Sequence, residues 1–152
     1  MVNNKFPVNV MMEKHMKNFK KNNSKNLINT LKCLKKSVSN KNDEEVYNKF
    51  YYQVKRWSLC ECDQKSSLNF LMSDNLGNVY MDTSKDNDKN SFSNAKNGKV
   101  HKDKIDSLEI FKKMKNSNSV LHVNDDKKHV YMGYKLGFSN NTDAVILLTM
   151  DL

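Results

Sequence analysis

The sequence contains little proline, glycine, arginine or cysteine, and it has no long apolar run. With 1 Pro and 4 Gly among 152 residues, it does not have the composition of a flexible, linker-type chain. No apolar run is long enough to span a bilayer, and the first twelve residues lack the apolar core of a signal peptide. The 3 cysteines, an odd number, do not suggest a disulfide framework. These absences favour an intracellular, cytoplasmic protein in a reducing compartment.

Lysine and asparagine are abundant instead, and lysine carries almost all of the positive charge because Arg56 is the only arginine. The codons of both residues are rich in adenine and thymine, so an AT-rich genome explains part of this bias. The net charge is +9 and the mean hydropathy is -0.80. Residues 1–58 contain 13 Lys or Arg against 4 Asp or Glu, whereas residues 59–152 contain 13 of each. The uneven charge predicts that the first part contacts nucleic acid, an acidic protein surface or anionic lipid.

The first 58 residues are predicted to be mostly helical. Residues 1–24 are expected to form a basic arm, extended at first and then weakly helical, which ends in a polar run of Lys, Asn and Ser. Apolar residues at helical spacing predict an amphipathic helix over residues 24–38. A second helix is predicted over residues 42–58, where Asn42 and Glu45 have the spacing of a capping box and aromatic residues repeat on one face.

The apolar pattern changes to that of strands after residue 66. Strands are predicted at residues 68–73, 78–83, 120–123, 129–138 and 144–150. The last of these runs is the most apolar and is expected to be the central strand. A tight turn is predicted from Asp74 to Gly77, with Gly77 at positive φ. A long polar loop is expected over residues 84–104, with Asp103 capping a short helix that ends near Met114.

This order of elements predicts an α+β fold, with N-terminal helices packed on one face of an antiparallel sheet of about five strands. We divide the chain into the basic arm, residues 1–24, and a single α+β domain, residues 25–152. Within the domain, residues 25–58 are helical and residues 66–152 are rich in β-strand.

The stretch LMSDNLGNVYMDTS resembles the PAS/Cache family of sensor domains, with a strand, an Asp-x-x-Gly turn and a second strand ending near Asp-Thr. The closing stretch YMGYKLGFSNNTDAVILLTMDL is similar to the second half of that family, so the resemblance covers about residues 46–152. It implies a PAS/Cache-like sheet in a ligand-binding or dimerisation module. The polar loop lacks the aromatic and Arg cluster expected of a small-ligand pocket, and no cofactor or ligand residue is carried over. The composition also resembles that of large DNA viruses and of some AT-rich protists, and the first of these sources adds a virion as a location.

No constellation of residues predicts catalysis or a bound metal. Cys60 and Cys62, with Cys33 or a histidine, lack the second ligand pair of a zinc site, so free thiols are expected. His122 and His129 are expected to face each other across a hairpin, without a motif for nucleophilic catalysis around them. Neither a calcium loop nor a glycine-rich phosphate loop is present. The sequence therefore predicts a protein that is not an enzyme and has no cofactor.

The basic N-terminal part supplies the candidate binding residues: Lys14, Lys17, Phe19, Lys20, Lys21 and Lys25. Phosphate contacts need only positive charge, and the scarcity of arginine argues against the reading of bases. Two other interpretations of this part stay open. The lysines can form an ordinary solvated helix face. Alternatively, Met11, Met12, Met16 and Phe19 can dock on a partner chain.

Three functional hypotheses follow. The first is a non-enzymatic structural or assembly protein, such as a virion component, whose basic arm docks to other protein chains or to packaged nucleic acid. The second is a PAS/Cache-like module that binds a ligand or dimerises. The third is a nucleic-acid-binding protein without sequence preference.

Overall fold

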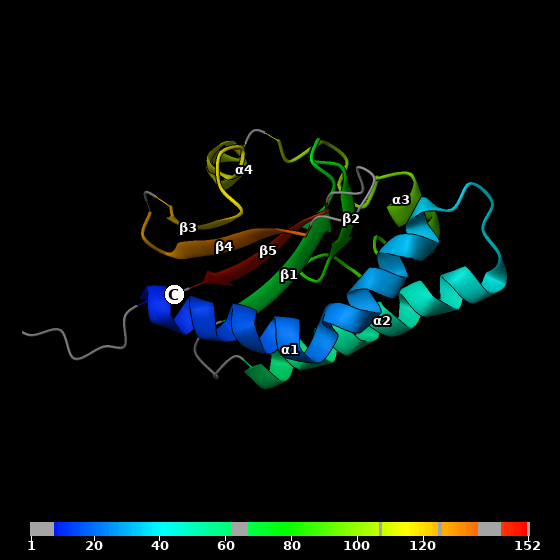
Figure 1. Cartoon of the computed structure of the whole chain (residues 1–152), viewed down its shortest axis with the longest axis horizontal. Helices are drawn as coiled ribbons and strands as arrows, with labels where there is room; N and C mark the ends of the chain where they lie inside the picture. The colour runs from blue at the N-terminus through cyan, green and yellow to red at the C-terminus, as the bar shows by residue number, and fades with distance from the viewer. Residues whose placement is uncertain (1–7, 62–66, 107, 125, 137–143, 152) are drawn as a thin grey trace, which may run out of the picture.

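Figure 1 shows the computed structural model of the chain, which describes residues 8–61, 67–106, 108–124, 126–136 and 144–151. The helices are α1 (Val8–Lys35), α2 (Lys41–Glu61), α3 (Phe92–Lys96) and α4 (Glu109–Met114). The strands are β1 (Ser67–Ser73), β2 (Val79–Asp82), β3 (Ser119–Val123), β4 (His129–Leu136) and β5 (Ala144–Asp151). This arrangement confirms the predicted α+β class.

The five strands form one antiparallel sheet in the order β2-β1-β5-β4-β3. β5 is central, as its apolar sequence predicts, and Ala144 to Leu148 are all buried. The turn between β1 and β2 is also confirmed, because Asp74 Oδ1 accepts hydrogen bonds from two backbone N–H groups of the turn and Gly77 has a φ of +87°. Because successive side chains of a strand point to opposite faces, the consecutive buried residues of β5 supply apolar side chains to both faces of the sheet.

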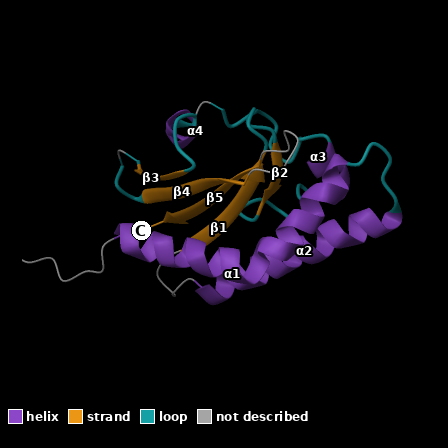
Figure 2. Cartoon of the chain, in the orientation of Figure 1, coloured by secondary structure: helices purple, strands orange, loops and turns teal. Residues whose placement is uncertain are grey.

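The long helices α1 and α2 form an antiparallel pair that covers one face of the sheet (Figure 2). An aromatic cluster joins the layers, with the ring centroid of Phe70 in β1 lying 4.8 Å from that of Phe19 in α1 and 6.1 Å from that of Phe50 in α2. The opposite face is partly covered by α4, since a Cβ atom on Gly133 would collide with the side chain of Met114. Helices thus lie on both faces, although the long ones lie on one, as predicted.

The predicted helix break near residues 20–24 is wrong, because α1 continues through this stretch without interruption. Asn23 is 1% exposed, and its Oδ1 accepts a hydrogen bond from Gln53 Nε2 of α2 at 2.8 Å. The hydroxyl of Ser24 donates to the carbonyl of Lys20, one turn earlier, at 2.6 Å. Hydrogen bonds to Asn23 Oδ1 and from the Ser24 hydroxyl therefore hold these polar side chains within the helix, although Asn23 Nδ2 is buried without a hydrogen-bond partner. Residues 8–24 belong to the same packed unit as the rest of the chain.

Two further boundaries differ from the prediction. The cap of α2 is formed by Asn40 and Asp43 rather than by Asn42 and Glu45, because Asn40 Oδ1 accepts from Asp43 N–H at 3.0 Å and Asp43 Oδ2 accepts from Asn40 N–H at 2.9 Å. The helix expected after Asp103 begins only at Glu109. The polar loop contains the short helix α3, and the predicted end of the fourth strand, residues 137–138, lies outside the described residues.

Candidate anion-binding surface on α1

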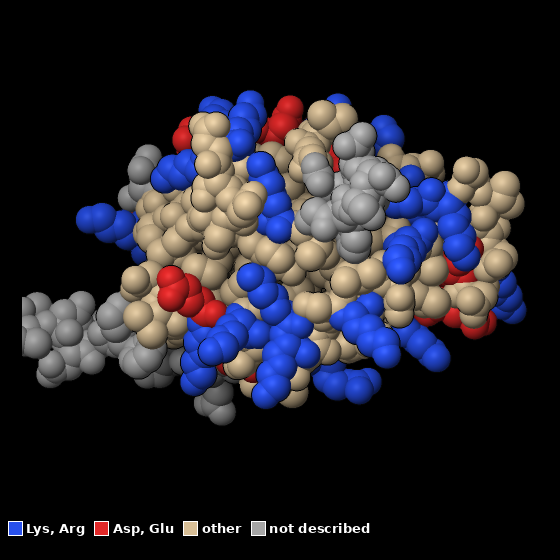
Figure 3. Space-filling view, in the orientation of Figure 1, with Lys and Arg blue, Asp and Glu red and all other residues tan. Residues whose placement is uncertain are grey.

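Four lysines of α1 lie along one side of the helix, and we call them the lysine face: Lys14, Lys17, Lys21 and Lys25. They recur at i, i+3, i+7 and i+11, which places them on the same side of a helix. At 1.5 Å per residue the face is about 17 Å long. All four side chains are exposed, and Figure 3 shows basic side chains gathered over α1. Glu13 is the only acidic residue in the 28 residues of the helix.

The charge of the lysine face is not neutralised within the chain. In the part of the chain that the structure describes, no ion pair joins any of these four ammonium groups to a carboxylate. Lys20 lies beside the face, where its Nζ is 4.1 Å from the centroid of the Tyr134 ring in a cation–π arrangement. An anion approaching α1 would therefore meet uncompensated positive charge.

The remaining predicted binding residue, Phe19, does not belong to this surface. It is 0% exposed and lies between the rings of Trp57 and Phe70, with centroid distances of 5.2 Å and 4.8 Å. Met12 and Met16 are buried as well, at 0% and 4% exposed. The interpretation in which these apolar residues dock on a partner chain is wrong, since they form part of the protein's own core.

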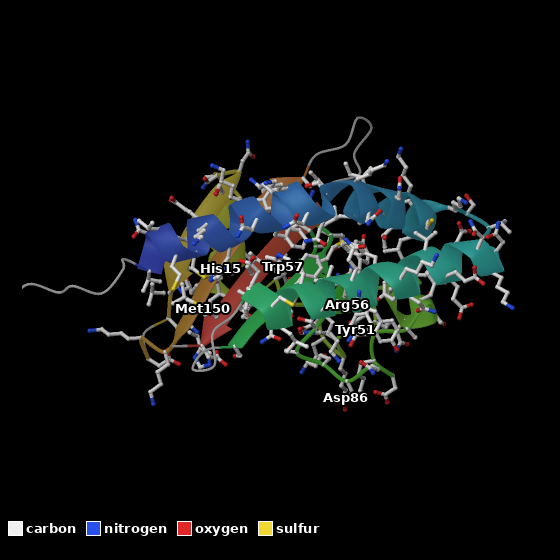
Figure 4. All side chains as sticks on the ribbon, turned by 90° about the horizontal axis from the view of Figure 1, so that it is seen from below. His15, Tyr51, Arg56, Trp57, Asp86 and Met150 are labelled. Atoms are coloured by element: carbon white, nitrogen blue, oxygen red, sulfur yellow. The ribbon has the colours of Figure 1, made fainter. Side chains whose placement is uncertain are left out.

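The position of α1 is fixed at both ends of the helix pair. Near its start, His15 Nδ1 lies 2.9 Å from Glu61 Oε2, and Asn18 Nδ2 donates to both oxygens of the same carboxylate at 3.2 Å. Figure 4 shows His15 near Trp57 of α2 and Met150 of β5. The Glu61 contacts could not be predicted from the sequence, because they join residues more than 40 positions apart. The lysine face is therefore presented on a preorganised helix.

A charged hydrogen-bond network closes the turn at the other end of α1. Lys36 Nζ donates to Asp43 Oδ1 at 2.7 Å. This hydrogen bond is the largest influence on Asp43 and lowers the pKa of its carboxyl to about 2; the backbone N–H of Asn40 acts in the same direction, and burial opposes both. The network leaves Lys36 engaged, which separates it from the unpaired lysines of the lysine face.

The other residues considered for chemistry lie apart from one another. Cys33 is buried and Cys60 exposed, and Cys62 lies outside the described residues. Across the described ranges, no group of three or more His, Cys, Asp or Glu side chains is placed to hold a metal ion. The expected pairing of His122 with His129 is wrong, since His122 lies opposite Tyr131 in the β3–β4 register.

The described helices include none that is both long enough and apolar enough to cross a membrane. No protein-family model, curated protein or solved structure matches the chain.

Proposed function

We propose that the protein is a non-enzymatic assembly protein that docks on nucleic acid, without sequence preference, through the lysine face. The observation that carries this proposal is the orientation of α1. The helix uses its apolar side, including Met12, Met16 and Phe19, to pack within the protein. Lysines are the most frequent of its exposed side chains, so charge is the means by which α1 can bind a partner.

The chemistry of the lysine face suits a phosphate backbone. A lysine ammonium contacts phosphate as a point charge, whereas reading guanine usually requires the bidentate geometry of arginine. If each of the four lysines neutralises one phosphate of duplex DNA, the logarithm of the binding constant should fall with the logarithm of salt concentration with a slope of about -3.6. An assembly that holds nucleic acid would gain a sequence-independent contact of this kind.

The test is a comparison of two variants with equal net charge. The first carries Lys14→Gln, Lys17→Gln, Lys21→Gln and Lys25→Gln. The matched control carries Lys41→Gln, Lys49→Gln, Lys115→Gln and Lys128→Gln, at exposed positions outside the lysine face. Fluorescence anisotropy of a labelled mixed-sequence duplex, measured over a salt series, gives the affinity and the salt slope of each protein. Circular dichroism melting shows whether each variant is folded.

We expect the lysine-face variant to bind at least tenfold more weakly at moderate salt and to lose most of the salt slope. The control should stay within about threefold of the parent protein, because its lysines are spread over other elements. An equal loss in the two variants would show that only net charge matters and would overturn the proposal. So would a parent protein that does not bind the duplex at low salt.

A second candidate is a PAS/Cache-like ligand-binding or dimerisation module. Its support is the order of elements after α2, in which two strands, two short helices and three strands follow one another. Sedimentation velocity over a range of protein concentrations tests the dimerisation form of this candidate. A sedimentation coefficient that rises with concentration in the absence of nucleic acid would favour it over docking through α1 alone.

A further inference from the structure

Residues 84–106, the part of the segment between β2 and β3 that precedes α4, have the composition of a polar loop, yet hydrogen bonds fix their shape. Asn90 is 3% exposed; its Oδ1 accepts from the N–H of Asp82 at 2.8 Å, and its Nδ2 donates to the carbonyl of Asp82 at 2.8 Å. Tyr51 of α2 donates its hydroxyl to Asn87 Oδ1 at 2.8 Å. Figure 4 shows Tyr51 beside the part of this segment that carries Asp86. The segment is therefore attached both to the sheet and to α2.

The far end of the segment is held against the β1–β2 turn. Ile105 N–H donates to the carbonyl of Gly77 at 3.0 Å, and a Cβ atom on Gly77 would lie only 2.6 Å from the backbone nitrogen of Asp106. Glycine is required here by this close approach as well as by its positive φ. A parallel bridge between Val79 and Lys99 holds the middle of the segment. Its side chains consequently project from a defined backbone.

A cleft of about 660 Å³ runs along this segment, and we call it the lysine cleft. Five lysines line it: Lys85, Lys89, Lys99, Lys102 and Lys104. Among the described lining residues, Asp103 carries the one carboxylate. No ion pair links any of the five lysines to a carboxylate within the described ranges. The volume is that of small-molecule sites, which span about 300–1,000 Å³.

The buried carboxylate behind the cleft is already occupied. Asp82 Oδ2 lies 2.5 Å from Nε2 of His101, a cleft residue, and Asp82 Oδ1 accepts from the N–H and hydroxyl of Ser84 at 2.9 Å and 2.6 Å. Burial is the largest single influence on the pKa of Asp82 and raises it, but the hydrogen bonds from His101 and Ser84 together outweigh burial, and the pKa is lowered. Asp82 thus holds the imidazole in the cleft wall and is not free to pair with the lysines.

We propose that the lysine cleft binds a small organic molecule that carries two or three phosphate groups. Five lysines against one aspartate give a net charge of +4 (five minus one). A phosphate monoester brings about -1.5 to -2 at neutral pH, so two of them bring about -3 to -4 and match the cleft. A chain of three linked phosphates matches it as well, because its inner groups carry about one negative charge each. Val100, Ile105 and Leu108 contribute apolar wall for the organic part of the ligand. The site is separate from α1 and does not depend on whether the lysine face binds nucleic acid.

The proposal is tested by calorimetric titration of the full chain with ATP in the absence of divalent cations, with pyrophosphate and with orthophosphate. The cleft variant carries Lys99→Gln and Lys102→Gln, and the control of equal net charge carries Lys115→Gln and Lys128→Gln, at exposed positions outside both the cleft and the lysine face. We expect ATP and pyrophosphate to bind more tightly than orthophosphate. The cleft variant should bind them at least tenfold more weakly than the parent, and the control should change their affinity less than twofold. Amide spectra of each variant establish that it is folded.

The same phosphate chemistry also occurs in lipid headgroups, and a second arm separates the two sources. Co-sedimentation is measured with phosphatidylcholine vesicles that contain or lack phosphatidylinositol bisphosphate. The cleft binds a lipid headgroup if the protein binds only the vesicles that contain phosphatidylinositol bisphosphate, and if the cleft variant loses this binding while the control keeps it. The cleft binds a soluble ligand if ATP or pyrophosphate binds the parent protein and the control, and if the cleft variant loses this binding. Absence of binding in both arms, or an equal loss in the two variants, overturns the proposal.

Discussion

At Asp43 a single side chain combines helix capping with charge pairing. Its carboxylate accepts from Lys36 Nζ and from the backbone N–H of Asn40, and both bonds favour the ionised form. The pKa in the folded protein is consequently about 2, below the ordinary value of 3.8. The unfolded chain therefore takes up this proton at higher pH than the folded protein does. The stabilisation from Asp43 is complete above about pH 5 and is lost progressively as the pH falls through about 4 to about 2.

Asp43→Asn tests this linkage. We expect the difference in unfolding free energy between the parent protein and the variant to be constant above about pH 5 and to shrink between about pH 4 and pH 2. Urea titrations at constant ionic strength, at half-unit intervals of pH, measure it. Lys36→Gln removes the ammonium partner of Asp43, so the unfolding free energy of this variant should depend less on pH over the same range. If the profiles of the parent and Asp43→Asn run parallel, the carboxylate does not have the low pKa.

At the scale of elements, the continuity of α1 has a direct consequence for stability. Phe19, in the first half of the helix, is fully buried against Trp57 and Phe70. We expect Phe19→Ala to lower the free energy of unfolding by about 3–5 kcal/mol, the usual cost of removing a buried phenyl ring. Val38→Ala is the control, because Val38 is 85% exposed and its loss should cost less than about 0.5 kcal/mol.

Chemical denaturation of the two variants measures the difference. Equal stability of Phe19→Ala and Val38→Ala would show that the first half of α1 does not pack on the sheet. The expected cost also explains why deletion of residues 1–24 is a poor test of nucleic-acid binding. Such a deletion would remove Met12, Met16 and Phe19 from the core together with the lysines, so loss of binding would not distinguish charge from unfolding.

The elements that could be predicted from the sequence are those specified by neighbouring residues. Short apolar runs between polar turns located all five strands, and the Asp74–Gly77 turn contains its own hydrogen-bonding partners. The continuity of α1 could not be predicted in this way. Asn23 is a buried helix residue only because Gln53, thirty positions away, donates to it. The same limit applies to residues 84–104, where the shape comes from contacts with β2 and α2 rather than from local pattern.

The candidate site was predictable in part for the same reason. The clustering of lysines in the first 25 residues predicts a basic surface, but it also places Phe19 there, because the sheet that covers Phe19 is distant in sequence. For the stretch that forms the lysine cleft, the sequence predicts only a long polar loop over residues 84–104. Its signal was the density of lysine between residues 85 and 104, and what sequence could not supply was the fixed backbone that brings five of those lysines to one cleft.

For the whole molecule, two clusters of exposed lysines lie on different elements. The lysine face lies on α1, and the lysine cleft lies along the segment between β2 and β3. In Figure 4, α2 lies between α1 and the part of that segment that carries Asp86. At physiological salt, exposed charges separated by more than about 8 Å interact weakly. Neither surface should therefore depend strongly on occupation of the other.

If both proposals hold, the two ligands should bind independently. Saturation of the cleft with pyrophosphate, at constant ionic strength, should change the affinity for a labelled duplex less than twofold, which corresponds to a coupling free energy below about 0.4 kcal/mol. Anisotropy titrations with and without pyrophosphate measure this change, and the duplex should in turn leave the calorimetric affinity for pyrophosphate unaltered, because coupling is reciprocal. Competitive displacement of the duplex would instead mean that both anions occupy one surface. The cleft variant Lys99→Gln/Lys102→Gln then identifies that surface, because it would weaken duplex binding only if the cleft is the shared site.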